Sequence, residues 1–254
     1  MFEIEEVPGV TIVRMRHGRA NALDVELCRA LRAFFQEAGR DPTGSVVLTA
    51  EGSIFSAGVD LLRVLEGGAA YVRDLLPALH QMCDAIFSFP HPLVAAINGH
   101  AMAGGCVLAC MADHRIMAKG PGRIGVPELS VGVPFPPAPL EIMRFVLPPQ
   151  HLSRVMIGGM THDPEEAREF GLVDEVAAPE ELIDRAVAVA QRLGSLHPAS
   201  FSLTKLQLRA PSLEQIRAAH DTQIQQLVEE IWATPEAIQR ISEHVERTFG
   251  AKKK

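Results

Sequence analysis

Residues 93–109 read LVAAINGHAMAGGCVLA, and this stretch does most to define the fold. The apolar run 93–97 predicts a buried strand, because a strand covered on both faces shows no polar alternation. Glycine-flanked residues 98–105 follow it, and the apolar residues after them predict a short helix. Such a turn leaves free backbone N–H groups at the positive end of the helix dipole. The stretch therefore predicts a backbone site for negative charge, with close helix packing as the alternative reading of its glycines.

The segments on either side continue an alternation of strands and helices. Residues 10–15 alternate apolar and polar positions and residues 46–50 form a second apolar run, so both predict strands. We expect Asp24 to cap a helix that reaches Ala38, and residues 71–87 to form a second helix with an apolar stripe. Strands that alternate with helices are typical of an α/β fold.

The last third of the chain predicts helices. Strand patterns nearly vanish after Pro137, and proline stands at or near the first turn of four expected helices. These helix starts are Asp163-Pro164, Pro198, Pro211-Ser212 and Thr234-Pro235. We divide the chain into a core, residues 1–195, and a helical region, residues 196–254. The apolar residues of this region indicate an interface between subunits, with packing onto the chain's own core as the alternative.

Composition excludes several classes of function. The chain has 254 residues, of which 47% are hydrophobic and 22% charged, as expected for one sizeable globular domain. Its 24 basic and 31 acidic residues form no basic stripe for a nucleic acid or an anionic membrane. No apolar run reaches membrane-spanning length, and the first residues do not resemble a secretory signal. We therefore expect no nucleic-acid or membrane partner.

The cysteines and histidines point away from disulfide and metal chemistry. Four cysteines lie mostly in apolar surroundings, which predicts buried thiols in a reducing compartment and hence a cytoplasmic protein. The sequence contains no CxxC or HExxH spacing, so we expect no metal site.

In addition to the glycines near residue 104, two further segments are candidates for a chemical role. Residues 54–61, IFSAGVDL, follow a predicted buried strand at its carboxyl end, where a crevice can open. Glu128 stands among apolar and small residues, which would raise the pKa of its carboxyl group toward that of a useful acid or base. Taken singly, the first segment could be a tight turn and Glu128 a solvated loop residue. Two glycine-flanked backbone sites after two core strands are, however, the parts of an oxyanion hole.

These three segments resemble the enoyl-CoA hydratase/isomerase, or crotonase, superfamily in their order and spacing. The family pattern has F-[SA]-A-G-x-D-[LI] after the second core strand, then N-G-x-x-x-G-G-[GC] at a helix start, then P-E followed by G and P. Residues 19–23, RANAL, also resemble the family's coenzyme A loop, and residues 171–176, GLVDEV, resemble a later element. The resemblance implies a spiral of ββα units with a helical C-terminal region that forms a homotrimer or a dimer of trimers.

The resemblance also implies the substrate and the site. The substrate would be an acyl-CoA thioester, with coenzyme A as part of it and no separate cofactor. The backbone N–H groups of Ala57 and Gly104 would form the oxyanion hole, and Glu128 would move the proton. The residues expected along the substrate are Ala20, Ala22, Gly58, Val59, Asp60, Leu61, Gly105 and Val107.

Val107 is the main departure from the family pattern, because hydratases of the family carry a second catalytic glutamate at this position. Hydration divides water activation and proton delivery between two carboxylates, whereas moving a double bond from the 3,4 to the 2,3 position needs one. The resemblance is therefore strongest to the mitochondrial-type Δ3,Δ2-enoyl-CoA isomerases. The alternatives are a hydratase whose second acid is Glu141 or His100, another acyl-CoA lyase, or a catalytically idle acyl-CoA-binding subunit.

Overall fold

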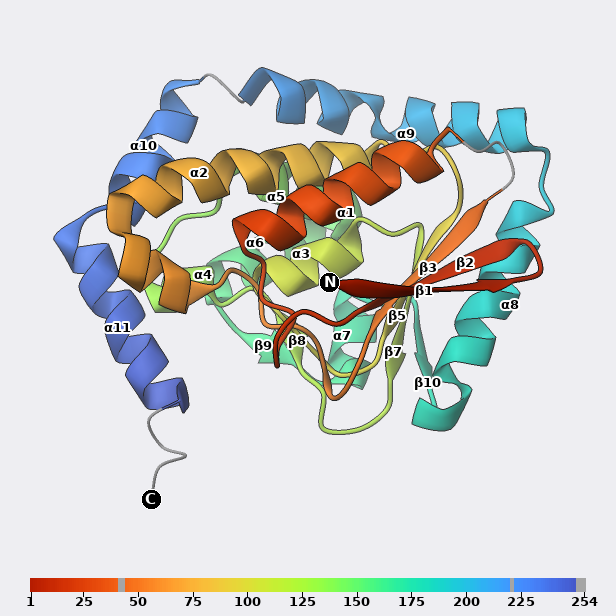
Figure 1. The fold of residues 1–254 in the computed structure, drawn as a ribbon, viewed down its shortest axis with the longest axis horizontal. Coiled ribbons are helices and arrows are strands. Elements are labelled where there is room, and N and C mark those ends of the chain that lie inside the picture. The colour runs from red at the N-terminus through yellow and green to blue at the C-terminus, as the bar shows by residue number, and fades with distance from the viewer. Residues whose placement is uncertain (41–43, 220–221, 250–254) are drawn as a thin grey trace.

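The computed structural model describes residues 1–40, 44–219 and 222–249, and it contains two β-sheets surrounded by helices (Figure 1). In spatial order, the six-stranded sheet consists of β1 (Phe2–Val7), β2 (Val10–Met15), β3 (Ser45–Ala50), β5 (Leu93–Ile97), β7 (His114–Ala118) and β10 (Glu175–Ala177). The four-stranded sheet consists of β4 (Ile54–Ser56), β6 (His100–Met102), β8 (Ile124–Gly125) and β9 (Thr161–His162). In the large sheet β1 pairs antiparallel with β2, and the other neighbouring strands pair parallel.

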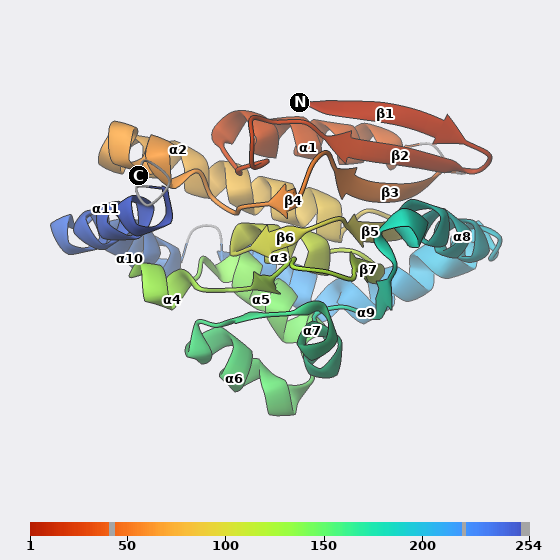
Figure 2. The ribbon, with the colours of Figure 1, turned by 90° about the horizontal axis from the view of Figure 1, so that it is seen from below.

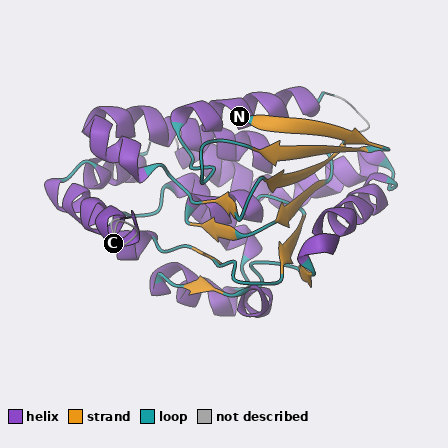
Figure 3. Cartoon of the chain, turned by 60° about the horizontal axis from the view of Figure 1, so that its bottom comes forward, coloured by secondary structure: helices purple, strands orange, loops and turns teal. Residues whose placement is uncertain are grey.

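Helices cover the sheets and make up most of the C-terminal part of the chain (Figure 3). They are α1 (Val25–Ala38), α2 (Leu61–Phe87), α3 (Gly104–Cys110), α4 (Glu128–Val131), α5 (Pro137–Val146), α6 (Pro149–Gly158), α7 (Pro164–Phe170), the 3-10 helix η1 (Pro179–Glu181), α8 (Leu182–Gly194), α9 (Pro198–Ala218), α10 (Gln223–Trp232) and α11 (Pro235–Phe249). Within the described part of the chain, every helix is too short or too polar to cross a membrane.

A strand–strand–helix unit recurs along the chain as β3–β4–α2, β5–β6–α3 and β7–β8–α4. In each unit the first strand joins the large sheet and the second strand joins the small sheet. The second strands β4, β6 and β8 pair parallel to one another, so the three segments that follow them meet at one edge of the small sheet. This arrangement confirms the predicted α/β fold of ββα units and brings the three candidate segments together.

The large sheet separates two apolar cores, one on each face (Figure 2). Successive side chains of a strand point to opposite faces. On β2, Val10 and Ile12 therefore pack with Ala186 of α8, whereas Val13 and Met15 join the larger core under α1 and α2. Because both faces are covered, β3 and β5 are buried along their whole length, which explains why apolar residues predominate in both.

The ends of the first two helices show what sequence patterns predict well and what they miss. Helix α1 follows the predicted cap, since the Asp24 carboxylate accepts a hydrogen bond from Leu27 N at 2.7 Å. Helix α2 begins at Leu61, ten residues before the predicted start at Tyr71. The two glycines near its start hid this extension, and Gly68 indeed kinks the helix with φ 54°.

The described residues of the C-terminal region form three helices, and one predicted helix start is wrong. Pro211 lies inside α9 and does not begin a new helix. Arg209 and Leu213 on either side of it are buried, so packing holds the helix together where proline removes a backbone donor. Helices α7, α9 and α11 start at the predicted prolines, and α9, α10 and α11 all pack against α2 (Figure 1).

Candidate active site

The segment after β4 is pressed against the start of α3 through Gly58. This glycine has φ 83°, and a methyl group added to it would stand 2.7 Å from Met102 O and 3.0 Å from Gly104 N. Any side chain would therefore separate the two loops. The next residue but one, Asp60, caps α2 by accepting hydrogen bonds from the backbone N–H groups of Leu62 and Arg63 at 3.1 and 3.2 Å.

The segment after β6 carries backbone strain next to the helix start. Ala103 has φ 52° and ψ −123°, a conformation that favours glycine, and the family pattern has the first glycine of its G-G pair at this position. Gly104 follows as the first residue of α3. Gly105 packs so closely on β4 that an added methyl group would stand 2.4 Å from Ser56 O. The strained turn thus aims the N–H group of Gly104 out of the helix start.

A parallel β-bridge between Leu23 and Val59 fixes the direction of the N–H groups in the first loop. Leu23 N donates to Gly58 O at 2.8 Å, and Asp60 N donates to Leu23 O at 3.0 Å. In such a bridge the N–H of Val59 itself points away from Leu23. A methyl group added to Gly104 would stand 3.7 Å from Val59 N. In the described part of the chain, the N–H groups of Val59 and Gly104 have no backbone acceptor.

Ala57 does not offer the donor that its place in the motif predicts. Its N–H donates to Ala20 O at 2.9 Å and so ties the first loop to the segment before α1. A backbone donor engaged in this way is not free for a substrate oxygen. The first free donor is therefore Val59, two residues further along the chain than predicted. Gly104 stands at the start of α3, as predicted.

Glu128 is the first residue of α4 and its side chain is buried. Only 8% of the residue is exposed, and its Oε2 atom has no hydrogen-bond partner among the described residues. Val126 and Val131 beside it are buried as well. Burial raises the pKa of Glu128 from 4.5 to about 8, against a weaker opposing effect of a backbone hydrogen bond. Near neutral pH such a carboxyl group can both accept and return a proton.

A cavity of about 760 Å³ joins these features. Its volume falls in the range of small-molecule sites, and most of its wall is apolar. The predicted site residues that line it are Ala20, Ala22, Ala57, Val59, Asp60, Leu61, Gly104, Val107 and Glu128. Gly58 and Gly105 do not line it and instead allow the close packing behind its wall.

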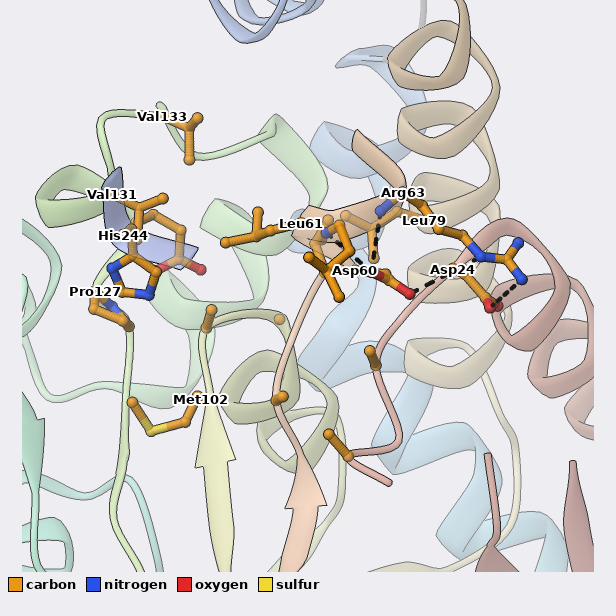
Figure 4. Close-up of a pocket in the computed structure, with 18 of the residues that line it drawn as sticks. Asp24, Asp60, Leu61, Arg63, Leu79, Met102, Pro127, Val131, Val133 and His244 are labelled. Atoms are coloured by element: carbon orange, nitrogen blue, oxygen red, sulfur yellow. Dashed lines mark hydrogen bonds and ion pairs between the residues drawn. The ribbon is translucent and has the colours of Figure 1, made fainter. Parts of the chain in front are cut away.

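Asp24 and Asp60, which also line the cavity, both form ion pairs with Arg63. Figure 4 shows Pro127 and His244 at the left of the cavity and Asp24, Asp60 and Arg63 at the right. Arg63 Nη2 lies 3.5 Å from Asp24 Oδ2, and Arg63 Nε lies 3.9 Å from Asp60 Oδ2. Both carboxylates also cap helices, so they are held in place and charge-compensated. Glu128 is therefore the one carboxyl group, among the described residues of the wall, that is free to exchange a proton.

Neither candidate for a relocated second acid reaches the cavity. Glu141 pairs with Arg144 at 2.6 Å, and His100 Nδ1 accepts a hydrogen bond from Arg123 N at 3.2 Å. Neither Glu141 nor His100 is part of the described cavity wall, whereas Val107 lines it and is buried. In the described ranges no group of three or more His, Cys, Asp or Glu side chains gathers that could hold a metal ion.

The sequence did not predict the part of the wall that the last helices supply. Residues from α2, α10 and α11 close the cavity: Arg63, Leu79, Trp232, His244 and Thr248. The single tryptophan, Trp232, is buried and donates its ring N–H to Pro134 O at 3.0 Å. Only the apolar stripe of the C-terminal helices hinted at this role, because no motif links these residues to the glycine loops.

This fold brings two backbone N–H groups without backbone acceptors and one buried carboxyl group to a single apolar cavity in the described part of the chain. A family model for enoyl-CoA hydratase/isomerase matches residues 5–251. The chain belongs to the enoyl-CoA hydratase/isomerase family.

Individual relatives include both isomerases and hydratases. The chain is 28% identical over 228 residues to mouse mitochondrial enoyl-CoA delta isomerase 1, covering 89% of this chain and 79% of the mouse protein. The human mitochondrial delta3-delta2-enoyl-CoA isomerase superposes with a TM-score of 0.92 at 25% identity, over 100% of this chain and 99% of the human one. The enoyl-CoA hydratase EchA3 of Mycobacterium ulcerans superposes with a TM-score of 0.82 at 29% identity, over 91% and 99% of the two chains.

Proposed function

We propose that this enzyme shifts the double bond of a 3-enoyl-CoA to the 2,3 position with Glu128 as its single acid–base group. The observation that carries the proposal is that the cavity has a carboxyl group at position 128 and a valine, not a second carboxyl group, at position 107. Glu128 has a free, buried carboxyl oxygen in the cavity, and Val107 occupies the position of the second hydratase glutamate. A similar fold in a delta3-delta2-enoyl-CoA isomerase supports the same choice.

The thioester oxygen binds between the N–H groups of Val59 and Gly104. Both groups lack backbone acceptors in the described part of the chain, and they approach each other across the close contact made by Gly58. Two donors aimed at one oxygen stabilise the negative charge that develops when a proton leaves the neighbouring carbon. Enolate formation, rather than substrate binding alone, is the step that these donors favour.

Glu128 then carries the proton between two carbons. As a carboxylate it removes a proton from carbon 2 of the acyl chain, and the electron pair moves into the enolate. The protonated carboxyl group returns the proton to carbon 4, and the double bond forms between carbons 2 and 3. The poor solvation that raises the pKa of Glu128 to about 8 makes both halves of this exchange accessible near neutral pH.

A hydratase is the main rival, because hydratases occur among the relatives. Hydration needs a second group that holds and activates water. Asp24 and Asp60 are the other carboxylates of the described wall, and both are engaged by Arg63. This arrangement favours the isomerase.

Parallel incubations of the purified enzyme with trans-3-enoyl-CoA and trans-2-enoyl-CoA test the proposal. We expect 2-enoyl-CoA from the first substrate and no appreciable 3-hydroxyacyl-CoA from the second. Rapid formation of 3-hydroxyacyl-CoA would assign the chain to the hydratases. No product from either substrate, with acyl-CoA bound, would indicate a catalytically idle binding subunit.

A further inference from the structure

His244 places an imidazole ring in the half of the cavity that holds Glu128. It lies on α11 and lines the cavity, at the same end as Pro127 and Val131 in the view of Figure 4. Helix α11 packs tightly against the end of α4, since a methyl group added to Gly132 would stand 2.5 Å from Arg240 Cδ. The ring is thus held on the side where the acyl chain must lie if Glu128 is to reach its carbons 2 and 4.

A neighbouring arginine fixes the hydrogen-bonding state of the ring. Arg247 Nη2 lies 3.2 Å from His244 Nδ1. A guanidinium group can only donate, so Nδ1 is the acceptor and the proton of the neutral ring sits on Nε2. Burial, followed by the charge of Arg247, lowers the pKa of His244 and keeps the ring neutral near pH 7. His244 therefore presents one N–H donor, at Nε2, and no cation.

The His244 side chain is partly buried, in a part of the wall that carries few polar groups. Figure 4 places Val131 and Val133 on the same side of the cavity as His244. Besides His244 and the Trp232 ring, whose N–H is already used, the polar side chains that α4, α10 and α11 contribute to the described wall are Glu128 and Thr248. No hydrogen bond from His244 Nε2 is found among the described residues. A hydrocarbon chain laid over it would remove its water and supply no acceptor, which disfavours binding.

We propose that His244 determines acyl specificity by donating its Nε2–H to an oxygen atom on the acyl chain. The preferred substrates are then enoyl-CoA thioesters whose acyl chain carries a hydroxyl or keto oxygen beyond carbon 4, and plain hydrocarbon chains bind less well. A site built to hydrogen-bond a substrate group discriminates strongly against an analogue that lacks the group. This inference rests on the proposed function, because it takes the cavity as the site of the acyl chain.

Binding of acyl-CoA molecules that cannot react tests the inference separately from catalysis. The single tryptophan, Trp232, lies in the cavity wall, so its fluorescence reports occupancy. The probes are decanoyl-CoA and analogues with one hydroxyl or keto oxygen at the sixth, seventh or eighth carbon. We expect wild-type Kd to be about tenfold lower for at least one oxygenated analogue than for decanoyl-CoA.

Variants of α11 identify the residue responsible. His244→Leu should abolish the preference, and His244→Gln, which keeps an N–H donor, should retain part of it. Ser242→Ala on the same helix lies outside the described cavity wall and should keep the wild-type preference. Equal Kd values for all probes in the wild type, a preference that survives in His244→Leu, or failure of every probe to bind would overturn the inference. A preference that depends on His244 in a chain without isomerase activity would uphold it while refuting the proposed function.

Discussion

Glu128 makes the fold less stable as the pH rises. The pKa of its carboxyl group is raised from 4.5 to about 8 in the folded chain. Between these values the folded state holds a proton that the unfolded state has released, so the free energy of unfolding falls as the pH rises through this window. We predict that Glu128→Gln is about as stable as the wild type near pH 4.5 and more stable, by on the order of a few kcal/mol, above about pH 8.

Urea unfolding of both proteins at about pH 5 and about pH 9 measures this difference. The substitution keeps the shape of the side chain and removes its charge, so a change that grows with pH reports the carboxyl group itself. A stability difference that is the same at both pH values would show that Glu128 titrates normally.

Gly104 offers a second test at the scale of one residue, because proline and alanine both add a β-carbon there but only proline removes the N–H group. Gly104→Pro removes the donor, and proline is tolerated at the first position of a helix. Gly104→Ala keeps the donor and places a similar carbon atom about 2.9 Å from Leu23 Cδ1. We expect Gly104→Pro to turn over 3-enoyl-CoA at least about 10²-fold more slowly than Gly104→Ala. Equal turnover numbers for the two variants would exclude this N–H group from the oxyanion hole.

Sequence alone located the segments that meet at the cavity but not the direction of each N–H group. Glu128 and Gly104 could be identified from residue type, order and apolar surroundings. The assignment of Ala57 as a donor failed because its N–H group donates to Ala20 O, whereas the bridge between Leu23 and Val59 leaves the N–H of Val59 without a backbone acceptor among the described residues. That bridge joins residues far apart in the chain, and no local pattern predicts it.

At the scale of elements, the partly buried carboxylate of Asp113 anchors α9 to the sheet. Asp113 Oδ2 lies 2.6 Å from Lys205 Nζ, and Asp113 Oδ1 lies 2.8 Å from Arg209 Nη2. Both cations are buried, so Asp113→Asn would leave them without a counter-charge. We expect this variant to lose about 3–5 kcal/mol in the free energy of unfolding.

A matched control is Asp84→Asn, which breaks the ion pair between α2 and the exposed Arg217. We expect it to cost under about 1 kcal/mol, because water screens an exposed pair. Chemical denaturation of the two variants makes the comparison. A cost for Asp113→Asn as small as that for Asp84→Asn would show that the buried cluster does not hold α9 in place.

The helices also show where local patterns suffice. Asp24 predicted the start of α1 because an N-cap acts on the next three residues. Gly68 and Pro211 led to two wrong helix starts. Because of Gly68, the predicted start of α2 came too late, and because of Pro211 a separate helix was predicted within α9. Tertiary packing overrode the local preference of Pro211, whereas Gly68 keeps a non-helical conformation and the helix continues beyond the kink.

At the scale of the whole molecule, α9 and α10 expose more apolar surface than a monomer is expected to carry. The exposed side chains are Leu203, Leu206, Leu208, Ile224, Leu227 and Ile231. Burial of such a surface between subunits is favourable, so we predict a trimer or a dimer of trimers. Light scattering at about micromolar concentration measures the mass, and a value near the 27.6 kDa of one chain would contradict the prediction.

The cavity is also a property of the whole chain, because its described wall runs from His17 to Thr248. The sequence predicted the alternation of strands and helices, but the order of strands in the two sheets depends on long-range pairing. The closing of the cavity by α10 and α11 depends on the same packing, which is why Trp232 and His244 were not predicted.

The fate of trans-3-enoyl-CoA with wild-type enzyme and Glu128→Gln tests the central claim most directly. We predict that the wild type forms trans-2-enoyl-CoA and that the variant binds the substrate, as followed by Trp232 fluorescence, but isomerises it at least about 10²-fold more slowly. Undiminished isomerisation by Glu128→Gln would contradict the claim that this carboxyl group alone carries the proton.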